Sequence, residues 1–178
     1  MGQIITKGKW TNVSEHGINL EGLNTNYIKW GIPASDPLGG QSGYEFKPVS
    51  AHVRFDGTEC KLGTFIHHNW AVVLTQAQQF SADLDIEVYF ADDNKVHPFR
   101  ANFGHNETVN SPTYQDDIVR LPTIDEPDFV HVDGVEYRVT ITGFSLNGFT
   151  VPEFHSPEGG SSQAHIVAKF EPTSSLGG

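Results

Sequence analysis

The sequence predicts an all-β protein, a single antiparallel β-sandwich of jelly-roll type with about ten strands and little or no helix. Three observations support this fold class. The 178 residues are enough for one domain with one sizeable core. The 18 glycines and 10 prolines indicate many turns. Short strand-like runs also recur between turn signals along the whole chain. We expect residues 1–172 to form the domain and residues 173–178 a flexible tail.

The strands of the N-terminal half are recognised by aromatic and β-branched residues between turn signals. We expect them at Lys9–Val13, Tyr27–Trp30, Ser42–Pro48, His52–Phe55, Cys60–Ile66 and Trp70–Leu74. A turn at Asp56-Gly57 separates the fourth from the fifth. The glutamine-rich segment Thr75–Ala82 is compatible with a short helix or with a crossing loop, and it does not change the fold class.

The cleanest alternation in the chain runs from Leu84 to Phe90. Its apolar residues occupy every second position, which is the pattern of a strand buried on one face. The turn signal Asp92-Asp93-Asn94 follows, and Val96–Asn102 comes next. These two runs are therefore expected to form a hairpin.

The C-terminal half contains the strongest hairpin signal. Asp133-Gly134 joins Phe129–Val132 to Val135–Phe144, and this dipeptide accepts the positive φ values of a type I′ turn. We expect an inner row on the second strand consisting of Val135, Tyr137, Val139 and Ile141. Asn147-Gly148 is a further tight turn. The last strand is expected at Ala164–Phe170, with Ile166, Ala168 and Phe170 facing inward.

Composition excludes several classes of partner. The chain has 11 Lys and Arg against 22 Asp and Glu, a net charge of −11. Without a basic stripe, nucleic-acid binding and anionic membranes are disfavoured, and no apolar run suits direct membrane insertion. Neutral ligands such as sugars, or divalent cations, suit this surface better. Cys60 is the single cysteine, so no intrachain disulfide is possible. The oligomeric state cannot be predicted.

The start of the sequence has no apolar signal-peptide core. We therefore expect a cytoplasmic protein if the chain is complete as given, and a secreted or cell-surface protein if a signal peptide was removed.

A set of short segments occurs in a fixed order between Trp10 and Phe170. The set consists of Trp30-Gly31, Gln41–Phe46, Leu62–Asn69, Leu84–Phe90, Phe103–Asn110, Asp117–Val119, Val135–Phe144 and Pro157–Gly159. In this order it resembles the choice-of-anchor K domain, which is found on bacterial proteins with varied C-terminal sorting signals. The resemblance implies a surface-associated β-sandwich domain. It carries no catalytic residue over to this chain, and the sequence shows neither an anchor segment nor a signal peptide.

The stretch from His105 to Pro122 holds the densest group of polar side chains. Its oxygen-bearing residues can supply ligands to Ca²⁺, which takes 6–8 oxygens. The predicted calcium ligands are Asn106, Glu107, Asn110, Asp116 and Asp117. The alternative is that the asparagine and threonine side chains cap their own turn.

Histidines and neighbouring polar residues are the candidates for ligand binding. The predicted ligand-binding residues are His67, His68, Asn69, His105, Asn106 and Tyr114. A transition-metal site is a further possibility, drawn from His67, His68, His97, His105 and His155. None of these has a recognised zinc spacing, and neighbours on a strand face opposite sides, so only one of His67 and His68 can join a given site.

Two other groups carry alternative functions. Asp83, Asp85 and Glu87 share one strand face, as the paired carboxylates of sandwich glycosidases do. Aromatic residues can form a platform for sugar rings, although tryptophans in sandwiches commonly fill the core. The candidates are Trp10, Trp30, Trp70, Tyr44, Tyr89 and Tyr114. No Gly-x-Ser-x-Gly motif or phosphate-binding loop is present.

The function expected from the sequence is recognition without catalysis. The chain is predicted to be an adhesion-like module that binds a glycan or a protein, with a structural calcium ion. The alternatives are an enzyme and a structural spacer. The enzyme would be a carbohydrate-active hydrolase using Asp85 and Glu87, or an isomerase with a small-molecule pocket.

Overall fold

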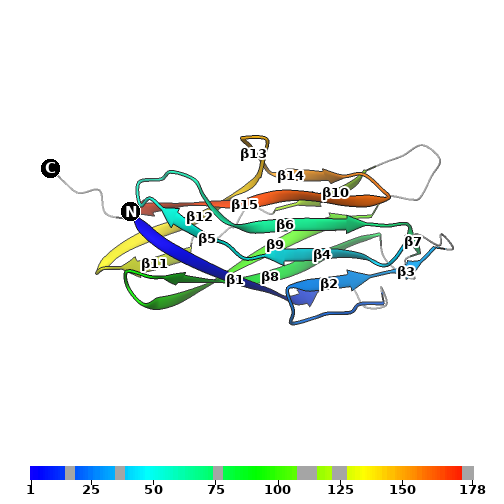
Figure 1. Ribbon diagram of the computed structural model, residues 1–178, viewed down its shortest axis with the longest axis horizontal. Helices are drawn as coiled ribbons and strands as arrows, with labels where there is room; N and C mark the ends of the chain where they lie inside the picture. The colour runs from blue at the N-terminus through cyan, green and yellow to red at the C-terminus, as the bar shows by residue number, and fades with distance from the viewer. Residues whose placement is uncertain (15–18, 35–38, 74–77, 108–115, 122–127, 174–178) are drawn as a thin grey trace.

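The computed structural model describes residues 1–14, 19–34, 39–73, 78–107, 116–121 and 128–173. Within these residues the chain is all-β and contains no helix, so none could span a membrane. Two large antiparallel sheets curl around one core, and the predicted all-β sandwich class is confirmed (Figure 1). The strands are β1 (Gly2–Val13), β2 (Tyr27–Trp30), β3 (Ile32–Pro33), β4 (Ser42–Lys47), β5 (Ser50–Val53), β6 (Cys60–Asn69), β7 (Val72–Val73), β8 (Gln79–Phe90), β9 (Lys95–Asn106), β10 (Asp117–Arg120), β11 (Asp128–Val132), β12 (Val135–Leu146), β13 (Phe149–Val151), β14 (Glu153–Ser156) and β15 (Gly160–Pro172).

The strand order determines which segments meet. The six-stranded sheet has the order β14-β10-β9-β8-β1-β5. The seven-stranded sheet has the order β11-β12-β15-β6-β4-β2, and β13 pairs with β12. Strands β3 and β7 pair at one end of the molecule, away from the two termini (Figure 1). The ends of β6, β9 and β10 nearest this pair carry the polar residues discussed below.

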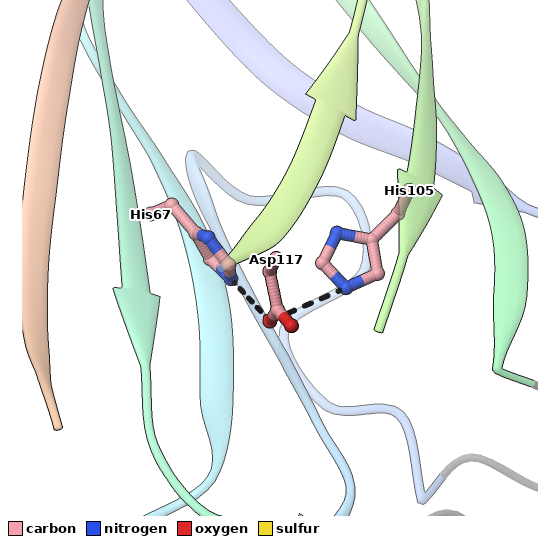
Figure 2. A group of neighbouring side chains, drawn as sticks. All are labelled: His67, His105 and Asp117. Carbon is pink, nitrogen blue, oxygen red and sulfur yellow. Dashed lines mark ion pairs between the residues drawn. The ribbon is translucent and has the colours of Figure 1, made fainter. Parts of the chain in front are cut away.

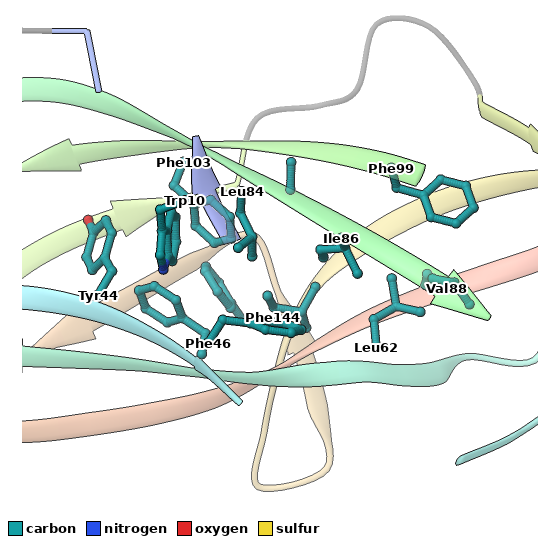
Figure 3. Close-up of a cluster of buried hydrophobic side chains, with 14 of the residues drawn as sticks. Trp10, Tyr44, Phe46, Leu62, Leu84, Ile86, Val88, Phe99, Phe103 and Phe144 are labelled. Atoms are coloured by element: carbon teal, nitrogen blue, oxygen red, sulfur yellow. The ribbon is translucent and has the colours of Figure 1, made fainter. Parts of the chain in front are cut away.

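Alternating apolar residues of both sheets build the core. On β8 the residues Leu84, Ile86, Val88 and Phe90 are buried, as the sequence predicts. Ile166, Ala168 and Phe170 of β15 are also buried, which confirms their predicted inward direction. Trp10 and Trp30 are fully enclosed, so they are core residues and cannot form an exposed sugar platform. Figure 3 shows the aromatic rings packed between the layers.

Several local predictions differ from the structure. More strands form than expected, because short pairings such as β3 with β7 carry little sequence signal. The sequence allows a short helix over Thr75–Ala82. Residues 79–82 of this segment instead begin strand β8, so that prediction is wrong for them. Val135 is 40% exposed because it lies beside the hairpin turn. A register shift between Ile141 and Gly143 then changes the alternation and turns Phe144 inward.

The Asp133-Gly134 turn yields a stability prediction. Asp133 has φ 51° and Gly134 φ 77°, as a type I′ turn requires. A Cβ added at Gly134 would meet no atom within 4 Å, so only backbone strain opposes Gly134→Ala. We expect a loss of about 1 kcal/mol in the free energy of unfolding, measured with urea. Gly160→Ala is the control, because Gly160 has equally open surroundings without a positive φ. Equal stability of the two variants would contradict this explanation.

Candidate functional site

Buried polar side chains gather between the sheets near the ends of β6, β9, β10 and β14. Figure 2 shows the carboxylate of Asp117 lying between the imidazoles of His67 and His105. All three side chains are enclosed in the fold. The cluster also includes Asn69, Glu107 and Ser156, which are buried as well.

Strand periodicity places these groups on the inner face. His67 points inward from β6 while its neighbour His68 points outward, as predicted for adjacent strand residues. His105 pairs with Val119 of β10, and Asp117 lies two residues from Val119 on the same face. Asp117 in turn pairs with Ser156 of β14. The cluster therefore joins strands of both sheets.

The donor atoms lie close together. Asp117 Oδ2 is 3.9 Å from His67 Nε2 and 3.9 Å from His105 Nε2. The candidate ligand atoms of these three residues all lie within 4.8 Å of one another. Glu107 Oε2 is 3.0 Å from His105 Nε2. Two imidazoles and one carboxylate thus converge on one small volume, with a second carboxylate at its side.

Aromatic rings enclose the cluster and orient it. The indole of Trp30 stacks on His67 with ring centroids 5.9 Å apart, and its Nε1–H donates a hydrogen bond of 3.2 Å to Glu107 Oε2. The hydroxyl of Tyr44 makes a hydrogen bond with His105 Nδ1. Because Nδ1 is engaged by Tyr44, Nε2 of the same ring is directed at the two carboxylates.

Burial controls the protonation of the site. Desolvation lowers the pKa of His105 to about 4, against the opposing effect of Asp117. It also holds the pKa of His67 well below the usual range, with smaller contributions from His105 and His68. Desolvation raises the pKa of Glu107 to about 7, against the hydrogen bond from Trp30. Both imidazoles are therefore neutral at pH 7 and their nitrogen lone pairs can bind a cation.

Some polar atoms of the cluster lack a hydrogen-bond partner within the described part of the chain. They are His67 Nδ1 and Nε2, Asn69 Oδ1, Glu107 Oε1 and Ser156 Oγ. Buried polar atoms are normally satisfied, and exceptions commonly mark a bound water or ion. The imidazole of His67 is the clearest case, because both of its nitrogens are without a hydrogen bond.

The structure separates the predicted calcium ligands. Glu107 and Asp117 reach the buried cluster, whereas Asn106 lies on the opposite face of β9 and borders a surface hollow. Asp116 is partly exposed and precedes β10. Asn110 lies outside the described residues.

The predicted ligand-binding residues also divide. His67, Asn69 and His105 belong to the buried cluster, and Asn106 faces outward. His68 lies on the outer face of β6, where Ser161 and Glu45 contact its two ring nitrogens at 2.6 and 2.9 Å. Tyr114 lies outside the described residues.

Of the five histidines considered for a metal, two meet. His67 and His105 converge, while His97 packs on Phe90 and His155 pairs with Glu153 on the surface. The convergence was missed because it depends on which strands face each other across the core. One local signal was available, since His105 and Glu107 are two residues apart and thus share a face at a strand end.

The carboxylates on β8 are tied to neighbouring strands. Asp85 accepts two hydrogen bonds from Arg100, at 2.7 and 3.1 Å, and these bonds lower its pKa. Asp83 accepts a bond of 2.6 Å from Asn102. A general acid needs a raised pKa, so Asp85 is poorly suited to that role in a hydrolase.

A surface hollow lies on the outer face of the six-stranded sheet. Its volume is about 370 Å³. Gly104 sits between Ser81 of β8 and Arg120 of β10, and the absence of a side chain there opens the space. The hollow is lined by Ser14, Gln79, Phe80, Ser81, Gly104, His105, Asn106, Ile118 and Arg120. Arg120 is held in place by Glu153, which accepts a bond of 2.6 Å from its Nε–H.

Comparison with models of known protein families and with curated protein sequences gives no match for this chain.

Proposed function

We propose that the chain is a recognition module that binds a neutral glycan in the hollow over Gly104. The hollow is the observation that carries this proposal. Its volume of about 370 Å³ falls in the range that accommodates small ligands. Side chains that border it offer hydroxyl, amide and guanidinium groups, which suit the hydroxyls of a sugar.

The outer face around the hollow is suited to binding. Hydrogen bonds between strands hold the polar side chains in fixed positions, as for Arg120 with Glu153 and Asp83 with Asn102. Preorganised groups lose little entropy when a ligand binds. The net charge of −11 favours a neutral glycan over an acidic one. The resemblance to a surface-associated domain family is in keeping with this role.

Gly104→Gln tests the proposal directly. A Cβ at this position would lie 3.9 Å from its nearest neighbours, both atoms of Arg120, so the longer side chain fills the hollow without disturbing the sheet. We expect a glycan array with the full chain to identify a neutral ligand. Calorimetry should then show at least a tenfold loss of affinity in the variant.

Gly160→Gln is the matched control, because it places the same side chain in open space on β15 of the other sheet. It should retain the affinity of the original chain. The proposal fails if no glycan binds, or if Gly104→Gln binds as tightly as Gly160→Gln.

A further inference from the structure

We propose that His67, His105 and Asp117 bind one divalent transition-metal ion of the Zn²⁺ class in the interior of the sandwich. His105 also borders the hollow over Gly104, but the ion site needs no ligand in that hollow. It starts from a fully enclosed imidazole, His67, whose ring nitrogens have no hydrogen bond among the described residues. Its Nε2 faces a carboxylate oxygen that a second imidazole faces from the other side (Figure 2).

The spacing of the donor atoms fits a shared ion. Ligands about 2.0–2.1 Å from a tetrahedral Zn²⁺ lie roughly 3.3 Å from one another. The two imidazole-to-carboxylate distances are 3.9 Å each. Each imidazole–carboxylate pair therefore needs a contraction of roughly half an ångström to share a zinc ion. The candidate ligand atoms of all three residues lie within 4.8 Å of one another. Glu107 borders the site, because its Oε2 lies 3.0 Å from His105 Nε2.

The donor set selects the class of ion. Two imidazole nitrogens with one carboxylate oxygen suit zinc and its transition-metal neighbours. Calcium prefers 6–8 oxygens. Of the oxygen ligands predicted from the sequence, Glu107 and Asp117 reach the cluster, whereas Asn106 faces the outer surface. The geometry therefore favours a transition metal over calcium.

The surroundings meet the other needs of a metal site. A ligating histidine usually has its second nitrogen held by a hydrogen bond, and Tyr44 provides this for His105. Trp30 packs against His67 and fixes Glu107 through its indole N–H. Phe80 covers His105 at a ring distance of 4.6 Å. The ligand groups are thus oriented before any ion binds.

The position of the ligands gives the ion a structural role. His67 belongs to β6 of the seven-stranded sheet, whereas His105 and Asp117 belong to β9 and β10 of the six-stranded sheet. The ion would therefore tie the two sheets together in the interior. It would also fix both ends of the connection between β9 and β10.

The test uses the full chain without an affinity tag, stripped of metal by a chelator that is then removed. When Zn²⁺ is added, each chain should bind one ion. The thermal unfolding midpoint should rise by about 5–10 °C when the free Zn²⁺ concentration is a hundredfold above Kd. Co²⁺ should give the intense visible absorption of a tetrahedral ion. His67→Leu and Asp117→Asn should abolish both effects.

His131→Leu is the control for surface binding, because the side chain of His131 is 62% exposed and distant in the chain from the cluster. It should bind one Zn²⁺ as the original chain does. A midpoint that does not move with Zn²⁺, or moves equally in His67→Leu, would overturn the proposal. A response to Ca²⁺ but not to Zn²⁺ would overturn the transition-metal assignment. If either variant does not fold, the Co²⁺ spectrum of the original chain decides, and a spectrum equal to that of aqueous Co²⁺ rejects the site.

Discussion

Gly63→Ala is expected to lower the free energy of unfolding by about 3 kcal/mol. A Cβ on Gly63 would lie 2.2 and 2.3 Å from Cε2 and Cζ of Phe46, and 3.0 Å from the carbonyl oxygen of Lys47. Phe46 is fully buried, so its ring cannot swing into solvent. On the other sheet, a Cβ at Gly8 would lie 2.4 Å from Cδ1 of the same ring. The ring thus fills the space that side chains at both glycines would need.

A double-mutant cycle separates this steric clash from a general weakening of β6. Urea unfolding should show the full loss for Gly63→Ala in the original chain and almost none in a Phe46→Ala background. Phe46→Ala itself should cost about 3–5 kcal/mol, because it leaves a cavity in the core. An equal cost of Gly63→Ala in the two backgrounds would show that the ring is not the obstacle.

The glycines around Phe46 illustrate what the sequence can and cannot predict. The strand Leu84–Phe90 and the Asp133-Gly134 hairpin depend on local periodicity and turn chemistry, and both are confirmed. The need for glycine at position 63 is not local. It arises because β4 brings the Phe46 ring against it, and that pairing is known only once the sheet order is known.

The buried cluster has the same origin. His67, His105 and Asp117 are each ordinary strand residues by sequence, and their separations match no metal-binding motif. They meet because β6 faces β9 and β10 across the core. The polar stretch from His105 to Pro122 contains two of the three residues, but His67 comes from a strand in the opposite sheet.

His67→Leu is expected to stabilise the metal-free protein by about 1–2 kcal/mol at pH 7. The imidazole is fully buried and its nitrogens make no hydrogen bond within the described residues. An unsatisfied buried polar group costs about 1–3 kcal/mol, and leucine fills a similar volume without that cost. Urea unfolding in the presence of a chelator measures the difference. His131→Leu, on the surface, should leave the stability within about 0.5 kcal/mol of the original chain.

The pH dependence of this difference identifies its cause. The pKa of His67 in the fold lies well below 6.5, so the unfolded chain takes up its proton first as the pH falls. The original chain therefore loses stability below pH 6.5 through this residue, by at most about 1.4 kcal/mol per pH unit. Glu107 acts in the opposite sense, because its pKa is raised to about 7, and it is present in both proteins.

The advantage of His67→Leu should consequently grow between pH 7 and pH 5. An advantage that stays constant over this range would mean that the imidazole does not resist protonation in the fold. A stability lower than that of the original chain at pH 7 would mean that His67 has a partner that satisfies its nitrogens. In that case hydrogen bonding in the metal-free protein would account for the histidine at position 67. The expected gain in His67→Leu would instead show that the metal-free fold carries an unsatisfied imidazole. The adjoining imidazole and carboxylate make a metal ion a ligand that fits it.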